Sequence, residues 1–286
     1  MNVIVCGLNS YLGNASLKYL PNDNFNVYGI VRDQEIVLNK LIIKTKAKLF
    51  NLDLIRDNTR LMNIQLPPCG VSFYFTQTPE LNDIVGANYE LLSIRNFIAF
   101  SKSQNCNRIV YVGTIYDRKH LKAIENLFIE YNIVYTIVLK DVAIGEETSF
   151  EEFMNKMLKN RFIFIYKPTK NIIFNPIRMM DLMQWLRQVN WDTTYLNQFV
   201  QYSGKQTIEL EKIMELYQKK YSHQIKYRHI PLKNRHMAKV LNKYFSGIPY
   251  DQYIAYINEI TDRSDIKDIS FVKQTSTNHT DLIELI

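Results

Sequence analysis

The sequence predicts an α/β protein with a doubly wound parallel sheet and a smaller, interleaved C-terminal α/β region. Three observations support this fold class. The chain opens with an apolar run, a glycine turn and a helix start, MNVIVCGLNSYLG. Strand-like and helix-like segments then alternate over the first 145 residues, with short connections between them. With 286 residues, of which 47% are hydrophobic, the chain is long enough to bury the large core that such a sheet needs.

The opening stretch is the first element. Residues 2–6 are apolar and rich in β-branched side chains, which is typical of a buried parallel strand. Gly7 permits a tight turn, and residues 10–18 have the pattern of a helix that begins at a polar cap, Ser10. Backbone N–H groups and the positive end of a helix dipole then converge where a pyrophosphate commonly binds. Such a turn also occurs in α/β proteins that hold no ligand there, so the motif alone leaves both interpretations open.

The next elements continue the alternation of strand and helix. Their short connections predict right-handed crossovers in one parallel sheet. We expect strands at residues 25–31, 48–52, 71–75, 108–112 and 133–139, and helices at residues 83–103 and 121–131.

The rhythm loosens after residue 145. We therefore expect a nucleotide domain over residues 1–145 and a smaller substrate-side region over residues 146–286. In the second region we expect helices at 150–159, 179–189 and 207–221, extended segments at 161–166 and 199–202, and a tail from residue 232 that is helical with few strand signals.

Composition excludes several classes of protein. The three cysteines have no C-x-x-C spacing and the histidines lack ligand partners at metal-binding spacing, which predicts a reducing compartment and no metal site. No leader pattern and no apolar run of transmembrane length is present, so we expect a cytoplasmic protein without a transmembrane segment. The net charge of +7 suits phosphate-bearing ligands or peripheral contact with an anionic membrane, but it lacks the basic runs of a nucleic-acid binder. The 19 Tyr and 15 Phe suggest that some aromatic side chains line a pocket.

Three further stretches bear on a dinucleotide. Arg32 ends the second strand, where a guanidinium can bind the 2′-phosphate of NADP; the alternative is an exposed arginine at a strand end. Asp33 follows it, and we expect the strand to point this side chain elsewhere. Asp53 follows the third strand and can accept a hydrogen bond from an adenine amino group, cap the next helix, or do both. The FTQTP stretch, residues 75–79, leaves the fourth strand beside the expected nicotinamide ribose.

Taken together, GLNSYLG, VRD, LDL, VSFYFTQT, RIVYVGT and the PI-x-x-x-D of residues 176–181 resemble the atypical short-chain dehydrogenases, and most of all their NmrA-like, NAD(P)H-binding branch. The resemblance has specific motifs over about the first 190 residues. It implies a Rossmann-type fold and NADP(H) as cofactor. The cofactor-binding residues that it implies are Gly7, Asn9, Ser10, Tyr11, Leu12 and Gly13 at the pyrophosphate, Arg32 at the 2′-phosphate, Asp53 and Leu54 at the adenine, Thr76 and Gln77 at the ribose, and Gly113 with Thr114 beside the nicotinamide.

The chain departs from the family at the residues that transfer a proton to or from the substrate. The wider family carries a Ser or Thr after the fifth strand and a Tyr-x-x-x-Lys pair, in which the lysine lowers the pKa of the tyrosine. Thr114 matches the first position, but Tyr116 is followed four residues later by His120. A neutral imidazole lacks the permanent charge of a lysine. Ser10 also replaces the middle glycine of the fingerprint.

Two classes of function remain. The first is an NADPH-dependent reductase of a small apolar electrophile, such as a quinone or an enone, with Thr114, Tyr116 and His120 as candidate catalytic residues. The second is a non-catalytic redox sensor, or an assembly factor, that binds NADP(H) and acts through a protein partner. The sequence leaves a monomer and a homodimer open.

Overall fold

The structure is a computed structural model that describes residues 1–40, 45–56, 64–76, 84–114, 120–145, 148–160, 162–167, 173–220, 228–246 and 269–276. The chain divides into two compact units that alternate along the sequence. The first comprises Met1–Lys140, Met179–Tyr202 and Ser270–Gln274, and the second comprises Asp141–Arg178, Ser203–Ile269 and Thr275–Ile286.

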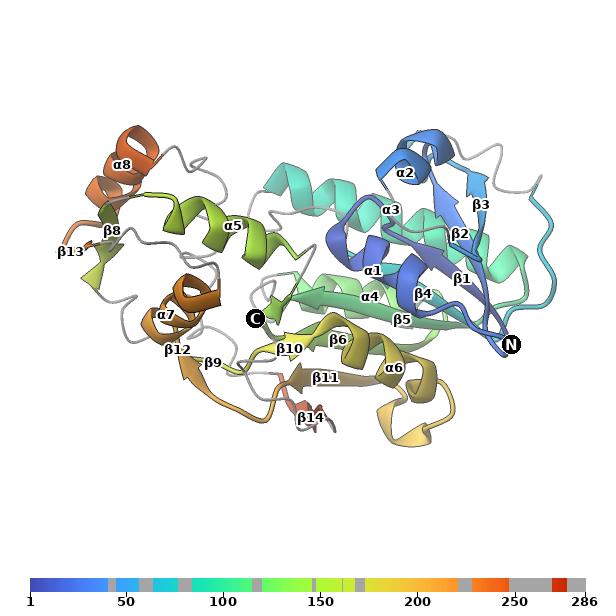
Figure 1. Ribbon diagram of the computed structural model, residues 1–286. Helices are drawn as coiled ribbons and strands as arrows, with labels where there is room; N and C mark the ends of the chain where they lie inside the picture. Colours follow the sequence, from blue (N-terminus) through green and yellow to red (C-terminus); the bar gives the residue numbers. More distant parts are fainter. Residues whose placement is uncertain are drawn as a thin grey trace. The chain divides into compact units, whose positions relative to one another are not determined.

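The first unit is built on an eight-stranded sheet in the order β14-β11-β6-β5-β4-β1-β2-β3 (Figure 1). Every pair from β11 to β3 is parallel. The order runs outward in both directions from β1 and β4, which is the doubly wound arrangement that the sequence predicts. The strands are β1 (Asn2–Cys6), β2 (Asn26–Val31), β3 (Lys48–Asn51), β4 (Val71–Phe75), β5 (Arg108–Thr114), β6 (Val134–Lys140), β11 (Gln198–Ser203) and β14 (Phe271–Thr275).

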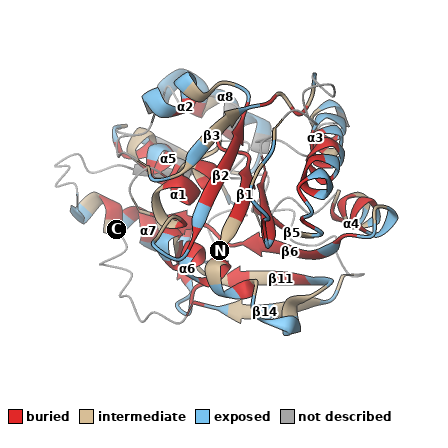
Figure 2. Ribbon diagram, turned by 90° about the vertical axis from the view of Figure 1, so that its right-hand side faces the viewer, coloured by how far each residue is buried: buried red, intermediate tan, exposed pale blue. Residues whose placement is uncertain are grey.

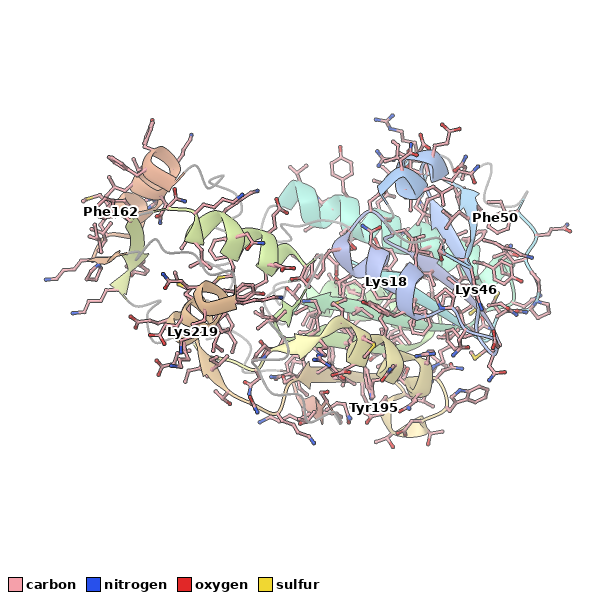
Figure 3. The ribbon with its side chains drawn as sticks, in the orientation of Figure 1. Lys18, Lys46, Phe50, Phe162, Tyr195 and Lys219 are labelled. Carbon is pink, nitrogen blue, oxygen red and sulfur yellow. The ribbon has the colours of Figure 1, made fainter. Side chains whose placement is uncertain are left out.

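Helices cover both faces of this sheet. α1 packs against α6 on one face, and α3 packs against α4 on the other (Figure 2). Trp185 of α6 meets the ring of Tyr195 edge-on, with ring centroids 5.4 Å apart; Figure 3 labels Tyr195. The helices of this unit are α1 (Tyr11–Tyr19), α2 (Gln34–Lys40), α3 (Ile84–Ser103), α4 (Leu121–Glu130), α6 (Met179–Val189) and a short 3-10 turn at Thr193–Tyr195.

The central strands are buried on both faces (Figure 2). In β4 every residue is buried, and in β1 only the first is not. A strand covered on both faces cannot alternate polar and apolar residues, so continuous apolar runs such as VIVC and VSFYF predict it well.

The described residues of the second unit form short strand pairs and three helices. β7 (Ala143–Ile144) pairs with β10 (Ile177–Arg178) and β8 (Phe162–Tyr166) with β13 (Arg228–Leu232), both in parallel, whereas β9 (Ile173–Phe174) and β12 (Ile208–Glu209) are antiparallel. The helices are α5 (Ser149–Leu158), α7 (Leu210–Lys220) and α8 (Arg235–Ser246). The ring of Phe150 of α5 meets those of Phe174 and Tyr217 edge-on and that of Phe153 at a tilt, so part of the aromatic excess forms the core of this unit.

Several elements differ from those expected. β14 lies in the tail from residue 232 that was expected to be helical, so that expectation is wrong there. The predicted helix at 207–221 begins instead with the short strand β12, and α2, β7, β9, β10 and all but the last residue of β13 lie where no element was predicted. None of the helices in the described ranges is both long and apolar enough to cross a membrane.

Candidate functional site

A glycine turn joins β1 to α1 at the carboxyl edge of the sheet. Gly7 has a φ of +83°, a left-handed conformation that favours glycine. A Cβ atom at this position would lie 1.9 Å from the carbonyl oxygen of Phe75, the last residue of β4. The turn therefore lies where the strand order reverses, and close packing against β4 already requires its glycine.

Ser10 caps α1. Its Oγ accepts a hydrogen bond from the backbone N–H of Gly13 (3.1 Å) and donates one to the carbonyl of Gly7 (2.8 Å). A Cβ atom on Gly13 would lie 2.2 Å from that same carbonyl oxygen. Tyr11, half-buried, and Leu12, buried, follow the cap. The structure thus brings together the residues predicted for the pyrophosphate at one helix N-terminus, whose dipole and first-turn N–H groups attract anions.

A small open pocket with a cavity volume of about 30 Å³ lies beside the turn. The carboxyl ends of β1 and β2 and the turn after β3 line it, together with Ser93 of α3. The combination of charged, amide and apolar groups suits a nucleoside. Its lining includes the predicted cofactor residues Gly7, Asn9, Arg32, Asp53 and Leu54.

Arg32 and Asp53 form an ion pair across this pocket. The Nε of Arg32 lies 3.3 Å from Oδ2 of Asp53, and the arginine side chain is 60% exposed while the aspartate side chain is 17% exposed. Oδ1 of Asp53 accepts hydrogen bonds from the backbone N–H groups of Ile55 (2.9 Å) and Arg56 (3.3 Å). Within the described ranges the terminal nitrogens of Arg32 have no protein partner, so they are available to a ligand. Asp53 caps the following turn, as one interpretation of the sequence expected.

Asp33, next to Arg32, caps the start of α2 and does not line the pocket. Its Oδ1 accepts hydrogen bonds from the backbone N–H groups of Glu35 (2.9 Å) and Ile36 (3.3 Å) at the start of α2. The side chain is therefore committed to that helix, in agreement with the expectation that it points away from the ribose position.

Thr76 lies directly after β4, buried, and its hydroxyl is used by the protein. Its Oγ1 donates to the carbonyl of Val112 (3.1 Å) and shares a hydrogen bond with the hydroxyl of Tyr111 (3.0 Å). A Cβ atom on Gly113 would lie 3.1 Å from this Oγ1, so that glycine leaves room for the contact. Thr76 therefore ties β4 to β5, a role that the sequence alone did not suggest.

The predicted catalytic residues flank a stretch outside the described residues. Thr114 ends β5, where it pairs in register with Lys140 of β6. His120 is half-buried and precedes α4; its carbonyl accepts a hydrogen bond from the N–H of Ile124 (3.0 Å), and its side chain makes no capping bond. Tyr116 and the predicted ribose residue Gln77 both lie outside the described residues.

Two features of the site were missed in the sequence. Lys140, the last residue of the apolar strand VYTIVLK, is 2% exposed. Glu90 of α3, also 2% exposed, lies near Cys6 and Tyr74; burial and then this carboxylate raise the pKa of the Cys6 thiol and hold the pKa of Tyr74 well above its ordinary value. Both groups therefore stay protonated and unreactive. A charged residue ending an otherwise apolar strand is the signal that could have pointed to Lys140.

No cluster of acidic, cysteine or histidine side chains in the described part of the chain could hold a metal ion. No protein-family model and no curated protein matches the sequence.

Similarity to solved structures is extensive at low identity. The leucoanthocyanidin reductase of Vitis vinifera, solved with NADPH, is 12% identical with a TM-score of 0.65, and the match covers 96% of this chain and 92% of that one. The UDP-glucuronic acid 4-epimerase of Bacillus cereus, solved with UDP-glucuronic acid and NAD, is 11% identical with a TM-score of 0.62 over 91% and 99% of the two chains. A nucleoside-diphosphate-sugar epimerase of Staphylococcus aureus is 13% identical with a TM-score of 0.63 over 92% of each chain. The chain therefore has a Rossmann-type α/β fold, which this reductase and these two epimerases share.

Proposed function

We propose that the chain binds NADP(H) at the carboxyl edge of its parallel sheet, as an atypical short-chain dehydrogenase of the NmrA-like kind. The observation that carries the proposal is the pocket beside the capped glycine turn, with Arg32 and Asp53 held across it by their ion pair. In a doubly wound sheet this is where the adenosine half of a dinucleotide binds. The similar structures, some solved with NAD or NADPH, support a nicotinamide dinucleotide as the ligand.

Arg32 supports NADP(H) over NAD(H). A carboxylate at the end of the second strand would select the free ribose 2′-hydroxyl, whereas a guanidinium binds a phosphate with two parallel hydrogen bonds. Asp33 is not such a carboxylate, because its oxygen is bonded to the start of α2. Among the described residues, the ion pair of Arg32 is made through its Nε, and the side chain is 60% exposed.

The pyrophosphate would bind at the N-terminus of α1. The side chain of Ser10 already occupies the N–H of Gly13, which leaves one fewer donor for phosphate than a glycine at this position would. We therefore expect a micromolar rather than nanomolar affinity.

When bound, the cofactor would supply hydride chemistry for a small apolar electrophile such as a quinone or an enone. Thr114, half-buried at the end of β5, would steady an oxygen on which negative charge develops. A second candidate is a redox sensor without turnover. It is favoured by the hydroxyl of Thr76, which the protein uses to join β4 to β5, and by His120 in the place of a relay lysine.

Binding is tested by calorimetric titration of the purified chain with NADPH, NADH and adenosine 2′,5′-bisphosphate. Arg32→Ala should weaken NADPH and the bisphosphate by about 1.5–3 kcal/mol, the value of a hydrogen bond to a charged group, and leave NADH unchanged. The matched control is Arg95→Ala, which removes an exposed arginine of α3. Equal affinities for NADPH and NADH that Arg32→Ala does not alter would contradict the assignment of NADP(H).

A further inference from the structure

Lys140 places a buried positive charge at the carboxyl edge of the sheet. Its side chain is 2% exposed, and its register partner is Thr114, the last residue of β5. Its Nζ lies 5.1 Å from the ring centroid of Tyr11, the first residue of α1. Lysine is rarely buried in this way, because desolvation of an ammonium is costly. Its position at the sheet edge that holds the candidate site makes Lys140 a candidate for a role in that site.

Lys140 and the Arg32 pocket lie on opposite sides of the point between β1 and β4 where the strand order reverses. Arg32 follows β2, whereas Lys140 ends β6, and β1, β4 and β5 lie between them in the sheet. The two halves of a dinucleotide bind over the two halves of a doubly wound sheet. With the adenosine half in the Arg32 pocket, the nicotinamide half extends over the carboxyl ends of β4, β5 and β6. The inference below thus rests on the proposed function.

The charge of the nicotinamide ring depends on its redox state. The oxidised ring is a cation and the reduced ring is neutral, while the rest of the dinucleotide is the same. A buried ammonium is screened little by solvent and salt, so it repels the oxidised ring and not the reduced one. We infer that Lys140 makes this site discriminate between the two redox states, and that it binds NADPH more tightly than NADP⁺.

The carboxylate of Asp141, next to Lys140, determines how the preference between the two redox states should change when the lysine is replaced. Asp141, the next residue, is also 2% exposed, and its Oδ1 accepts a hydrogen bond from the N–H of Val142 (2.8 Å). Replacing the ammonium by a neutral group leaves this carboxylate as the nearest buried charge along the chain. A carboxylate attracts a cationic ring, so the preference for the reduced form should disappear or reverse.

The experiment measures dissociation constants for NADPH, NADP⁺ and adenosine 2′,5′-bisphosphate in the parent chain, Lys140→Met and Lys140→Arg. Methionine keeps the length of the side chain without its charge, and arginine keeps the charge. The matched control is Lys48→Met, since Lys48 also lies over a tyrosine ring, that of Tyr28 at 6.0 Å, but is exposed at the start of β3. Two unit charges about 10 Å apart at an effective dielectric of about 20 correspond to roughly tenfold in affinity, and the Asp141 carboxylate offsets part of this. In the parent and in Lys140→Arg, NADP⁺ should therefore bind about threefold to tenfold more weakly than NADPH.

In Lys140→Met that ratio should fall to unity or below, and in Lys48→Met it should stay at the parent value. The bisphosphate lacks the nicotinamide, so an unchanged affinity for it shows that a variant is folded and that its adenosine site is intact. Equal binding of NADPH and NADP⁺ by the parent would overturn the inference without any variant. A parental ratio that persists in a Lys140→Met protein with normal bisphosphate binding would overturn it as well. If the parent binds none of the three ligands, the proposed function itself fails, and this inference with it.

Discussion

The carboxylate of Asp53 bonds Arg32 with one oxygen and its own backbone turn with the other. Oδ2 lies 3.3 Å from Nε of Arg32, and Oδ1 accepts the N–H of Ile55 at 2.9 Å. Because the arginine is largely exposed, the ion pair itself should contribute at most about 1 kcal/mol to stability. The pair mainly positions the guanidinium group of Arg32, the residue after β2, against the turn after β3.

This arrangement predicts different effects for the two partners. Asp53→Ala removes the cap and should lower the free energy of unfolding by about 1 kcal/mol, which urea denaturation measures. If Asp53 also accepts the adenine amino group, the same variant should weaken both NADPH and NADH by about 0.5–1.5 kcal/mol, and NADPH somewhat more because Arg32 loses its partner. Arg32→Ala should weaken NADPH alone. Unchanged affinities in Asp53→Ala would mean that the residue is a cap and nothing more.

Ser10 gives a second test of the turn. Ser10→Gly releases the N–H of Gly13 and should cost only a few tenths of a kcal/mol as a cap, so NADPH affinity should stay similar or improve. Ser10→Asp keeps a strong capping residue but adds a negative charge where the pyrophosphate is expected. It should leave thermal unfolding unchanged and weaken NADPH by tenfold or more, on the order of 1.4 kcal/mol. Normal binding by Ser10→Asp would show that the phosphates lie elsewhere.

Gly7 and Gly13 are required by close backbone packing as well as by the proposed binding of phosphate, and the sequence alone could not separate these two reasons. A Cβ atom at Gly7 would meet the Phe75 carbonyl, and one at Gly13 would meet the Gly7 carbonyl. Gly7→Ala should therefore destabilise the fold by about 3 kcal/mol or more, whether or not ligand is present.

The control for that substitution is Gly70→Ala. A Cβ atom there would meet only the flexible end of Met1, whose Cε would be 2.7 Å away and can move. Its midpoint of urea denaturation should stay close to that of the parent. A Gly7→Ala protein of parental stability would contradict the close packing between the turn and β4.

The sequence predicted the central sheet because its strands are buried on both faces and their apolar runs are continuous. It missed α2, where Val37 is the only buried hydrophobic residue among those described, since so short a helix has no clear apolar face. It also missed β14, whose residues are half-buried or exposed and which is fixed by its place beside β11 at the sheet edge.

The candidate site shows the same division. Gly7, Ser10 and Gly13 are near one another in the chain, so a local motif was enough to group them. Strand order and register bring Arg32 next to Asp53, and Lys140 next to Thr114. A linear pattern does not say which strand ends become neighbours. It did show that Arg32 and Asp53 follow successive strands, which is compatible with their pairing.

The last prediction separates an enzyme from a sensor. His120 replaces the relay lysine, and an imidazole does not supply the permanent charge that would make a neighbouring tyrosine a base at neutral pH. We therefore expect no oxidation of secondary alcohols or nucleotide sugars with NADP⁺. Any turnover should be reductive, on quinone-like or enone acceptors that need little help from a proton donor. NADPH consumption is followed by absorbance against a panel of such acceptors and of nucleotide sugars.

In a reductase, Thr114→Val and Tyr116→Phe should lower kcat, because each removes a hydroxyl that can steady the developing oxyanion, by about tenfold or more for a lost donor of this kind. His120→Ala should mainly raise KM. Activity on a nucleotide sugar that Tyr116→Phe abolishes would show that a proton relay survives in this chain despite His120. Tight NADPH binding without turnover on any acceptor would instead favour the sensor. Such a sensor would respond to the ratio of NADPH to NADP⁺ through the binding preference that Lys140 sets.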